Sequence, residues 1–427
     1  MLRISAQVPR FNVEKAQEIL RYSPMLMVQG ARQVGKSTLL HQTVGSDGHF
    51  VNLDDPQMMA FAQSDPRGFV EQEPDRLLVI DEVQRVPELA LALKASIDAD
   101  RRPGRFAVTG STNLLRMSSI SDSLAGRADI LNVYPLSQGE IIQRSTPEDW
   151  VTWILSGCEE GLDNALFKQE VNAEHVRMAV IAGGYPEPLK RPQRPASTWF
   201  SSYITQLSTH DARTLTASRE YPLHLQKMLK IFATQGQSEL VKAKIARELG
   251  ISEMALSDYV ELAKTMHLLS ELPSWGVGFS GRVIRRPKVS LIDSGLASFL
   301  SGLTQVKARQ VGGFELFGAT LESFVANELL KQQTWASESY EIYHYRQRNE
   351  EVDIVVELAD SRVILIEVKS AVNVDARAWR HLDSMMEKLG DRVAAAVLLY
   401  LGKEHMQISR PYGKIILTPV ASLWAHA

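Results

Sequence analysis

Short apolar runs alternate with helical stretches in the first part of the chain. Such runs occupy residues 25–28 and 77–80, and a third, residues 105–113, turns polar at its end. Continuous apolar runs of this length are typical of strands that are buried on both faces and connected by helices. The pattern predicts an α/β domain over residues 1–145, with a parallel sheet and helices on both of its faces.

The next block, residues 146–218, is predicted to be a helical domain. Val176, Val180 and Ile181 recur at the spacing of one helix face. A break follows at Gly183, where glycine interrupts the periodic pattern.

Residues 219–288 show the pattern of two helices joined by a short turn. We expect the helices over residues 241–249 and 253–266, followed by strands within residues 268–275 and 282–287. This order predicts a winged-helix-like domain. We expect such a domain either to bind a nucleic-acid duplex or to serve as a structural lid or interaction unit.

Some charged residues around this module oppose binding to a nucleic acid, and others favour it. The second helix would present Ser257 and Tyr259 to a groove, but the carboxylates of Asp258 and Glu261 repel phosphate. A cluster of basic residues next to it is the candidate for gripping a phosphate backbone. Its members are Arg282, Arg285, Arg286 and Lys288.

The last block, residues 289–427, alternates apolar and polar positions with a period of two. Strands are expected over residues 351–357 and 363–369. Glu367 and Lys369 are two residues apart and therefore lie on the same face of their strand. We expect a second α/β domain here.

Residues 30–37 match the phosphate-binding pattern Gly-x-x-x-x-Gly-Lys-Ser without a mismatch. Gly30 and Gly35 let the backbone N–H groups approach the phosphates, Lys36 supplies positive charge, and the Ser37 hydroxyl can ligate Mg²⁺. We therefore expect ATP and Mg²⁺ as cofactors. The predicted nucleotide-binding residues are Gly30, Ala31, Arg32, Gln33, Val34, Gly35, Lys36, Ser37, Thr38, Asp81 and Ser111.

Carboxylates follow directly after the apolar run at residues 77–80. Asp81 is placed to hold Mg²⁺ together with Ser37, and Glu82 is the candidate base that activates the attacking water. Ser111 is a candidate sensor of the γ-phosphate. Arg127 is either an arginine finger acting across a subunit boundary, which implies a homo-oligomer, or a surface arginine.

Several short motifs, spread over nearly the whole chain, resemble those of a known family. They are similar to those of predicted AAA-type ATPases of bacteria and archaea that carry a C-terminal domain of unknown function related to restriction-type nucleases. The residues that carry the likeness are 52–56, 81–89, 109–111, 124–127, 135–137, 183–187, 293–297 and 321–329. The resemblance implies a P-loop ATPase joined to a nuclease-like domain.

The C-terminal strands carry a second set of chemical groups. An acid, Asp353, is followed by Glu367-x-Lys369 at the end of an apolar strand, which is the arrangement of the PD-(D/E)xK nuclease fold. Asp353 and Glu367 can share Mg²⁺ while Lys369 orients or deprotonates a water for attack on a phosphodiester. Glu322, on the preceding helix, is a further candidate metal ligand.

Composition and charge limit the classes of protein to which the chain can belong. The net charge is −3, so any contact with DNA or RNA depends on a local patch rather than on a global basic excess. The single cysteine, Cys158, excludes an internal disulfide and fits a reducing compartment. Without an apolar run long enough for a membrane span or a signal-peptide pattern, we expect a cytoplasmic protein that does not bind membranes.

Three functions from different classes fit these observations. The first is an ATPase coupled to a metal-dependent nuclease that acts on DNA or RNA. The second is an ATP-dependent switch whose C-terminal domain only binds a protein or nucleic-acid partner. The third is a DNA-binding regulator that uses its winged helix.

Overall fold

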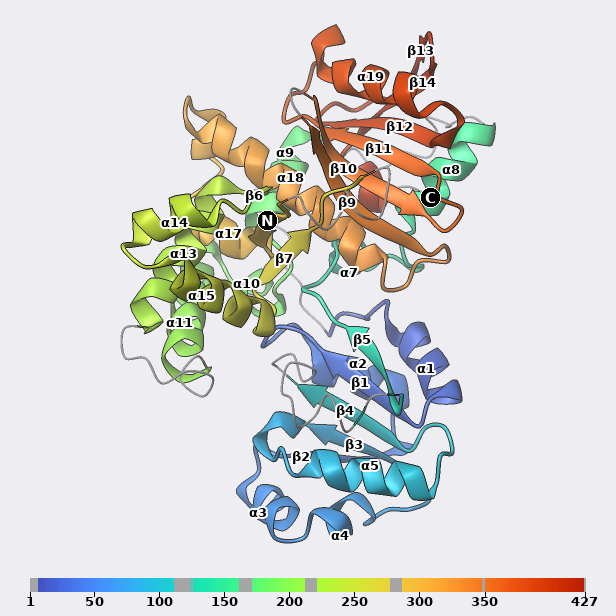
Figure 1. Cartoon of the computed structure of the whole chain (residues 1–427), viewed down its shortest axis with the longest axis vertical. Coiled ribbons are helices and arrows are strands. Elements are labelled where there is room, and N and C mark those ends of the chain that lie inside the picture. Colours follow the sequence, from blue (N-terminus) through green and yellow to red (C-terminus); the bar gives the residue numbers. More distant parts are fainter. Residues whose placement is uncertain are drawn as a thin grey trace. The chain divides into compact units, whose positions relative to one another are not determined.

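The structure is a computed structural model (Figure 1), and it describes residues 7–110, 124, 126–160, 171–211, 221–276, 286–347 and 350–425. The chain divides into two compact units by its internal contacts. The N-terminal unit contains Gln7–Leu136 together with Glu261–Leu268, and the C-terminal unit contains Ser137–Val260 and Leu269–Ala427.

The N-terminal unit is built on a five-stranded sheet with the order β2-β3-β4-β1-β5, in which each strand pair is parallel. Its strands are β1 (Met25–Gln29), β2 (Gly48–Asn52), β3 (Leu77–Asp81), β4 (Phe106–Gly110) and β5 (Ala128–Asn132). The α/β class and the parallel sheet predicted from the sequence are confirmed.

Helices cover this sheet. They are α1 (Val13–Tyr22), α2 (Lys36–Val44), α3 (Pro56–Ser64), α4 (Pro66–Val70), η1 (Val83–Arg85) and α5 (Leu89–Ala99). Met25 and Met27 of β1 share a hydrophobic cluster with Leu93 and Ile97 of α5. Because successive strand residues point to opposite faces and all of β1 is buried, both faces are covered at this strand.

Helices also dominate residues 137–313. They are α7 (Gln138–Ile141), α8 (Trp150–Glu160), α9 (Ala173–Ala182), α10 (Pro186–Leu189), α11 (Gln193–Gln206), the π-helical η4 (Leu207–Asp211), α13 (Tyr221–Gln235), α14 (Lys242–Leu249), α15 (Glu253–Thr265), α17 (Ser294–Ser301) and η5 (Lys307–Arg309). A small antiparallel sheet has the order β6-β8-β7. Its strands are β6 (Ser238–Glu239), β7 (Leu269–Leu272) and β8 (Lys288–Leu291).

The two helices expected from the sequence in this region are confirmed as α14 and α15, and Gly250 ends α14 with a φ of 70°. The second predicted strand, residues 282–287, stays a prediction over most of its length, and its last two residues, Arg286 and Pro287, lie just before β8 rather than in a strand. Residues 277–285 lie outside the described part of the chain, and β8 begins only at Lys288. Pro287 has no N–H for a sheet ladder, but its carbonyl oxygen accepts a hydrogen bond of 3.0 Å from the Leu240 N–H.

The remainder of the chain forms a six-stranded mixed sheet with the order β13-β14-β12-β11-β10-β9. Neighbours from β9 to β11 are antiparallel, whereas β11, β12 and β14 run parallel. The strands are β9 (Tyr340–Gln347), β10 (Glu350–Leu358), β11 (Val363–Val368), β12 (Val393–Tyr400), β13 (Met406–Arg410) and β14 (Gly413–Pro419). The helices are α18 (Gly313–Gln332), η6 (Ala376–Trp379), α19 (Arg380–Leu389), η7 (Gly390–Arg392) and α20 (Ser422–Ala425).

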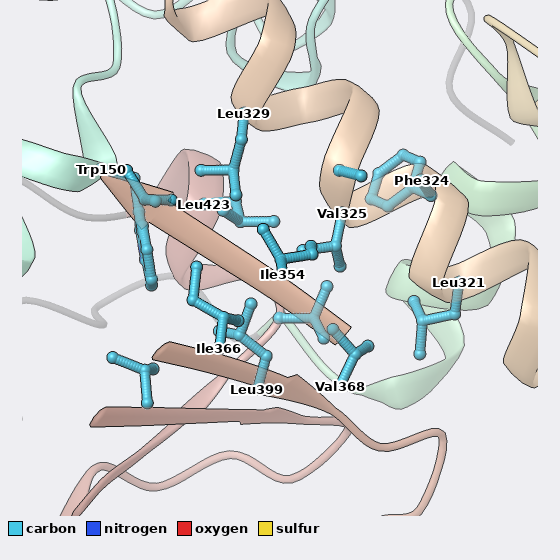
Figure 2. Close-up of a cluster of buried hydrophobic side chains, with 14 of the residues drawn as sticks. Trp150, Leu321, Phe324, Val325, Leu329, Ile354, Ile366, Val368, Leu399 and Leu423 are labelled. Carbon is cyan, nitrogen blue, oxygen red and sulfur yellow. The ribbon is translucent and has the colours of Figure 1, made fainter. Parts of the chain in front are cut away.

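The long helix α18 packs on one face of this sheet. Figure 2 shows Val325 and Leu329 of α18 directed at Ile354 of β10 and Ile366 of β11, and all four side chains are buried. The neighbouring strand residue Val355 belongs instead to the cluster that includes α19. This alternation is the period of two that the sequence predicted.

None of the described helices combines the length and the apolar character that a membrane crossing requires.

Candidate functional sites

The phosphate-loop sequence lies between β1 and α2 and depends on its two glycines. A Cβ atom on Gly30 would stand 2.1 Å from the carbonyl oxygen of Val133, so only glycine fits there. Gly35 has a φ of 99°, in the left-handed region that favours glycine, and it caps the start of α2. The loop of the sequence motif is therefore a wrapped turn ending at a helix N-terminus.

Lys36 is buried and its ammonium lies across the loop. Its Nζ donates hydrogen bonds of 3.0 Å to the carbonyl oxygens of Gly30 and Ala31. Burial lowers the pKa of Lys36 to about 8, against the opposing effect of the carboxylates of Glu82 and Asp81. The ammonium is therefore held among loop oxygens and close to the two carboxylates.

The other loop residues divide by exposure. Ala31 and Val34 are buried and anchor the loop, whereas the side chains that can reach a ligand are accessible. These accessible side chains are Arg32, Gln33, Ser37 and Thr38.

Asp81 and Ser37 come together at the end of β3. The Ser37 hydroxyl donates a hydrogen bond of 2.8 Å to Asp81 Oδ2, and Thr109 Oγ1 of β4 donates to Asp81 Oδ1. The carboxylate is thus oriented by hydroxyl groups from a helix and a neighbouring strand. Hydroxyl and carboxylate oxygens are donors that Mg²⁺ prefers, so these residues fit the expected ion.

Glu82 follows in a strained backbone conformation. Its φ of 59° is uncommon for a residue with a side chain. The Glu82 N–H donates to Thr109 Oγ1 at 3.1 Å, and its carboxylate accepts a hydrogen bond from the Gln84 side chain. Thr109 therefore fixes both acids at the strand end.

Two residues that hold this site were missed by the sequence analysis. Thr109 lies in the apolar strand β4 and was given no role in the site, although residues 109–111 are among those that carry the family resemblance. Arg10 is buried and donates hydrogen bonds of 2.9 Å to the carbonyl oxygens of Val34 and Tyr134. Nothing in the spacing of the motif points to Arg10.

Arg127 and Ser111 are the two remaining predicted residues of this site. Arg127 makes a two-pronged ion pair with Asp98 of α5, with Nε–Oδ1 and Nη2–Oδ2 distances of 2.8 Å. This pairing lowers the pKa of Asp98. Ser111 lies outside the described residues.

A second group of titratable side chains gathers in the C-terminal unit. It combines Glu322 from α18, Asp353 from β10 and Glu367 from β11. The last two are brought together by strand pairing, because Ile354 lies opposite Ile366. In addition, the Val368 N–H donates a hydrogen bond of 2.8 Å to Asp353 Oδ2.

These carboxylates affect one another strongly. Burial raises the pKa of Glu322 to about 8, and the carboxylate of Asp353 adds to the effect. Burial and Asp353 likewise raise the pKa of Glu367 to about 8. Proton uptake is thus favoured at this cluster, which we call the acidic site.

Lysines supply the positive charge at the acidic site. Lys369 Nζ lies 2.6 Å from Glu367 Oε1, and although burial disfavours its ammonium, Asp353 and Glu367 raise its pKa. Lys288 Nζ lies 2.7 Å from Glu322 Oε1 and 3.0 Å from Glu351 Oε1.

The expected place of Lys288 in an exposed basic cluster is wrong. Its side chain is only 2% exposed, because β8 is the central strand of its sheet and the lysine points toward α18 and β10. Of the other three members of that cluster, Arg282 and Arg285 lie outside the described residues.

Within the described ranges, no group of three or more His, Cys, Asp or Glu side chains is arranged to hold a metal ion. Glu367 Oε2 is nevertheless buried without a hydrogen-bond partner, and a buried carboxylate oxygen of this kind fits a divalent cation. The assignment of Asp353, Glu367 and Glu322 to Mg²⁺ stays a prediction.

Comparison with known proteins adds family information. Residues 22–142 match the family described as an AAA domain, and residues 173–307 and 317–423 match two domains of unknown function, DUF8612 and DUF4143. The uncharacterized proteins Rv2008c of Mycobacterium tuberculosis and Mb2031c of Mycobacterium bovis are each 24% identical over 343 residues, covering 80% of this chain and 69% of theirs.

Among solved structures, the Walker-type ATPase paby2304 of Pyrococcus abyssi has 16% identity and a TM-score of 0.44, covering 68% of this chain and 94% of its own. The family match at residues 22–142 agrees with the loop geometry and the parallel sheet of the N-terminal unit. Together they support an AAA-type P-loop ATPase domain in this part of the chain.

Proposed function

We propose that the N-terminal unit binds ATP with Mg²⁺ and hydrolyses it. The observation that carries this proposal is the hydrogen bond from Ser37 to Asp81, which joins the helix after the loop to the end of β3. Loop N–H groups and Lys36 bind the phosphates, Ser37 and Asp81 hold Mg²⁺, and Glu82 activates water. The bound ion supplies neutralisation of the phosphate charge.

Nucleotide binding and phosphate release, measured on the full chain, test the proposal. Lys36→Ala should lose both, whereas Glu82→Gln should bind ATP and fail to release phosphate. Lys15→Ala, on the exposed part of α1, serves as the matched lysine control. Turnover by Lys36→Ala at the rate of the parent would reject the assignment.

Arg127 belongs to the same proposal as a finger acting in trans. That role requires the ion pair with Asp98 to open when two chains associate. The phosphate-release rate per chain should then rise with protein concentration, and Arg127→Ala should abolish the rise. A rate that is independent of concentration in the parent, with Arg127→Ala still active, would remove the finger in trans.

For the C-terminal unit we propose a nuclease-like effector that engages DNA or RNA. The element order α18-β9-β10-β11-α19-β12 supports it, with β9 to β11 antiparallel and β12 parallel to β11. Asp353 and Glu367 hold Mg²⁺ in this proposal, and Lys369 orients a water molecule near the scissile phosphate.

Labelled single- and double-stranded DNA and RNA, incubated with Mg²⁺ or Mn²⁺, test the effector. Cleavage by the parent and its loss in Asp353→Ala and Lys369→Ala would support a nuclease and identify its polymer. Cleavage that survives both substitutions points to a contaminant and contradicts the site.

A molecular switch without cleavage is the second candidate. It is favoured by the ion pair between Lys369 Nζ and Glu367 Oε1 at 2.6 Å, in which the lysine occupies one of the oxygens that would bind a metal ion. In this case ATP turnover persists, no polymer is cut, and the C-terminal unit binds a protein or nucleic-acid partner in one nucleotide state only. Pull-down of partners with ATP and with ADP, compared between the parent and Glu82→Gln, distinguishes the two candidates.

A regulator that binds duplex DNA is the third candidate. The order α13-β6-α14-α15-β7-β8 supports a winged-helix module. Sequence-specific and salt-sensitive duplex binding that weakens in Arg285→Ala and Arg286→Ala would favour it. Duplex binding that is unchanged by these substitutions would exclude a role of Arg285 and Arg286 in holding the phosphate backbone.

A further inference from the structure

The ammonium group of Lys288 is enclosed between two carboxylates at the acidic site. Its Nζ bridges Glu322 Oε1 at 2.7 Å and Glu351 Oε1 at 3.0 Å, with 2% of the side chain exposed. Burial alone disfavours a charged amine, but the carboxylates of Glu322 and Glu351 pair with this one directly and stabilise its charged form. The lysine is therefore a permanent cation within the site.

The backbone around Lys288 is fixed on both sides. Asn327 Nδ2 of α18 donates a hydrogen bond of 2.9 Å to the carbonyl oxygen of Leu291, at the end of β8. On the other side, His344 Nε2 lies 3.1 Å from the carbonyl oxygen of Arg286. Since a carbonyl can only accept, the imidazole donates this bond. Lys288 is thus positioned by contacts with α18 and β9.

The carboxylates of the acidic site are not equally paired with positive charge. Glu322 and Glu351 share Lys288, whereas Lys369 pairs with Glu367 through only one carboxylate oxygen. The other oxygen, Glu367 Oε2, is buried and lacks a hydrogen-bond partner. The position that still favours a cation therefore lies on the side of Asp353 and Glu367.

We propose that Lys288 acts as a built-in cation that takes the place of a divalent metal ion at Glu322. The acidic site then accepts one divalent ion, next to Asp353 and Glu367, and Glu322 is not a metal ligand. This inference rests on the metal site of the proposed function, but it concerns a separate residue from another sheet. A second divalent ion beside the ammonium is disfavoured by their mutual repulsion.

Mn²⁺ binding to the full chain tests this proposal, with free Mn²⁺ followed by electron paramagnetic resonance and no nucleotide present. The parent and all variants carry Asp81→Asn, so that the nucleotide site contributes equally to Mn²⁺ binding in each of them. Lys288→Met removes the charge and keeps the length, and Lys288→Arg keeps the charge. We expect one bound ion in the parent and in Lys288→Arg.

Lys288→Met should gain a second ion or bind Mn²⁺ about tenfold more tightly, because a charge within a few ångströms has been removed. This gain should disappear when Glu322→Gln is added. Equal binding by the parent and a folded Lys288→Met overturns the proposal. Circular dichroism and tryptophan fluorescence establish that each variant is folded.

A second comparison covers the case in which Lys288→Met does not fold. Glu322→Gln alone should leave one ion bound, whereas loss of that ion would make Glu322 a ligand and overturn the proposal. Asp353→Asn addresses the proposed function separately. If Mn²⁺ binding survives Asp353→Asn, the metal site at Asp353 and Glu367 fails, and the comparison at Lys288 still decides the role of the lysine.

Discussion

Gly30→Ala is the sharpest test of the phosphate loop, because the structure leaves no space for a methyl group. The new Cβ atom would lie 2.1 Å from the Val133 carbonyl oxygen, whereas ordinary contact begins at 3.4 Å, so a shift of more than 1 Å is needed. Val133 cannot yield easily, since its N–H donates a hydrogen bond of 2.8 Å to the Gln29 carbonyl oxygen. We expect the free energy of unfolding to fall by about 2–3 kcal/mol, as is typical of overpacking.

Two spectroscopic probes isolate the unit in which this loss occurs. Every tryptophan lies in the C-terminal unit, so tryptophan fluorescence follows that unit, while far-ultraviolet circular dichroism follows both. The tryptophans are Trp150, Trp153, Trp199, Trp275, Trp335, Trp379 and Trp424. In urea, the unfolding transition followed by tryptophan fluorescence should be the same in Gly30→Ala and in the parent. The transition followed by circular dichroism should move to lower urea concentration only in the part that belongs to the N-terminal unit.

Nucleotide affinity provides the second reading of the same variant. A displaced loop should weaken ATP binding by about tenfold or more, since each 1.4 kcal/mol changes affinity tenfold. Gly45→Ala is the control: it has a φ of 60°, no atom lies within 4 Å of its added Cβ, and it follows α2 rather than the loop. Gly45→Ala should lose stability without losing affinity. Parent-like stability and affinity in Gly30→Ala would refute the reasoning.

Three further predictions concern buried groups. Burial raises the pKa of Glu148 to about 8 from 4.5, so the folded state binds a proton that the unfolded state releases, and stability falls as pH rises through this range. Glu148→Gln should flatten that part of the pH dependence in urea unfolding; an unchanged slope contradicts it. Trp150→Ala should cost about 3–5 kcal/mol, because the side chain is fully buried and donates to Ser422. Met254→Ala, at an exposed position, should change the fluorescence transition by less than about 0.5 kcal/mol, and equal effects would refute the packing argument. Arg10→Met should weaken ATP binding because two carbonyl groups of the loop region lose their donor, while Lys15→Met should not; identical affinities measured by fluorescent-nucleotide titration would contradict it.

The nucleotide site was accessible to sequence reasoning because its parts are contiguous. Residues 30–37 form one loop, and Asp81 and Glu82 follow an apolar run that identifies them as a strand end. Parallel strand order then brings the strand ends together at one edge of the sheet. Thr109 and Arg10 were not found, since a lone hydroxyl or guanidinium has no local spacing pattern.

The acidic site was found only in part for a related reason. Asp353 and Glu367 lie on adjacent strands and Lys369 directly follows the second, so the period of two predicts their common face. Lys288 lies more than sixty residues before Asp353 in the chain, and its contact depends on how β8 packs against α18. Its three basic neighbours in the sequence suggested solvent exposure, whereas the central position of β8 buries it.

The six-stranded sheet ends in two edges that differ in how they are protected. At β9, the segment preceding the undescribed residues 277–285 pairs with the strand, because the Trp275 N–H donates to the His344 carbonyl oxygen at 2.6 Å and the His344 N–H donates to that of Pro273 at 2.9 Å. At the opposite edge, β13 is a short strand that carries charge at Arg410. Pairing at His344 therefore blocks the addition of a foreign strand there, a common route to aggregation. Two copies of this chain could extend the sheet at His344 only by first displacing the segment that already pairs there.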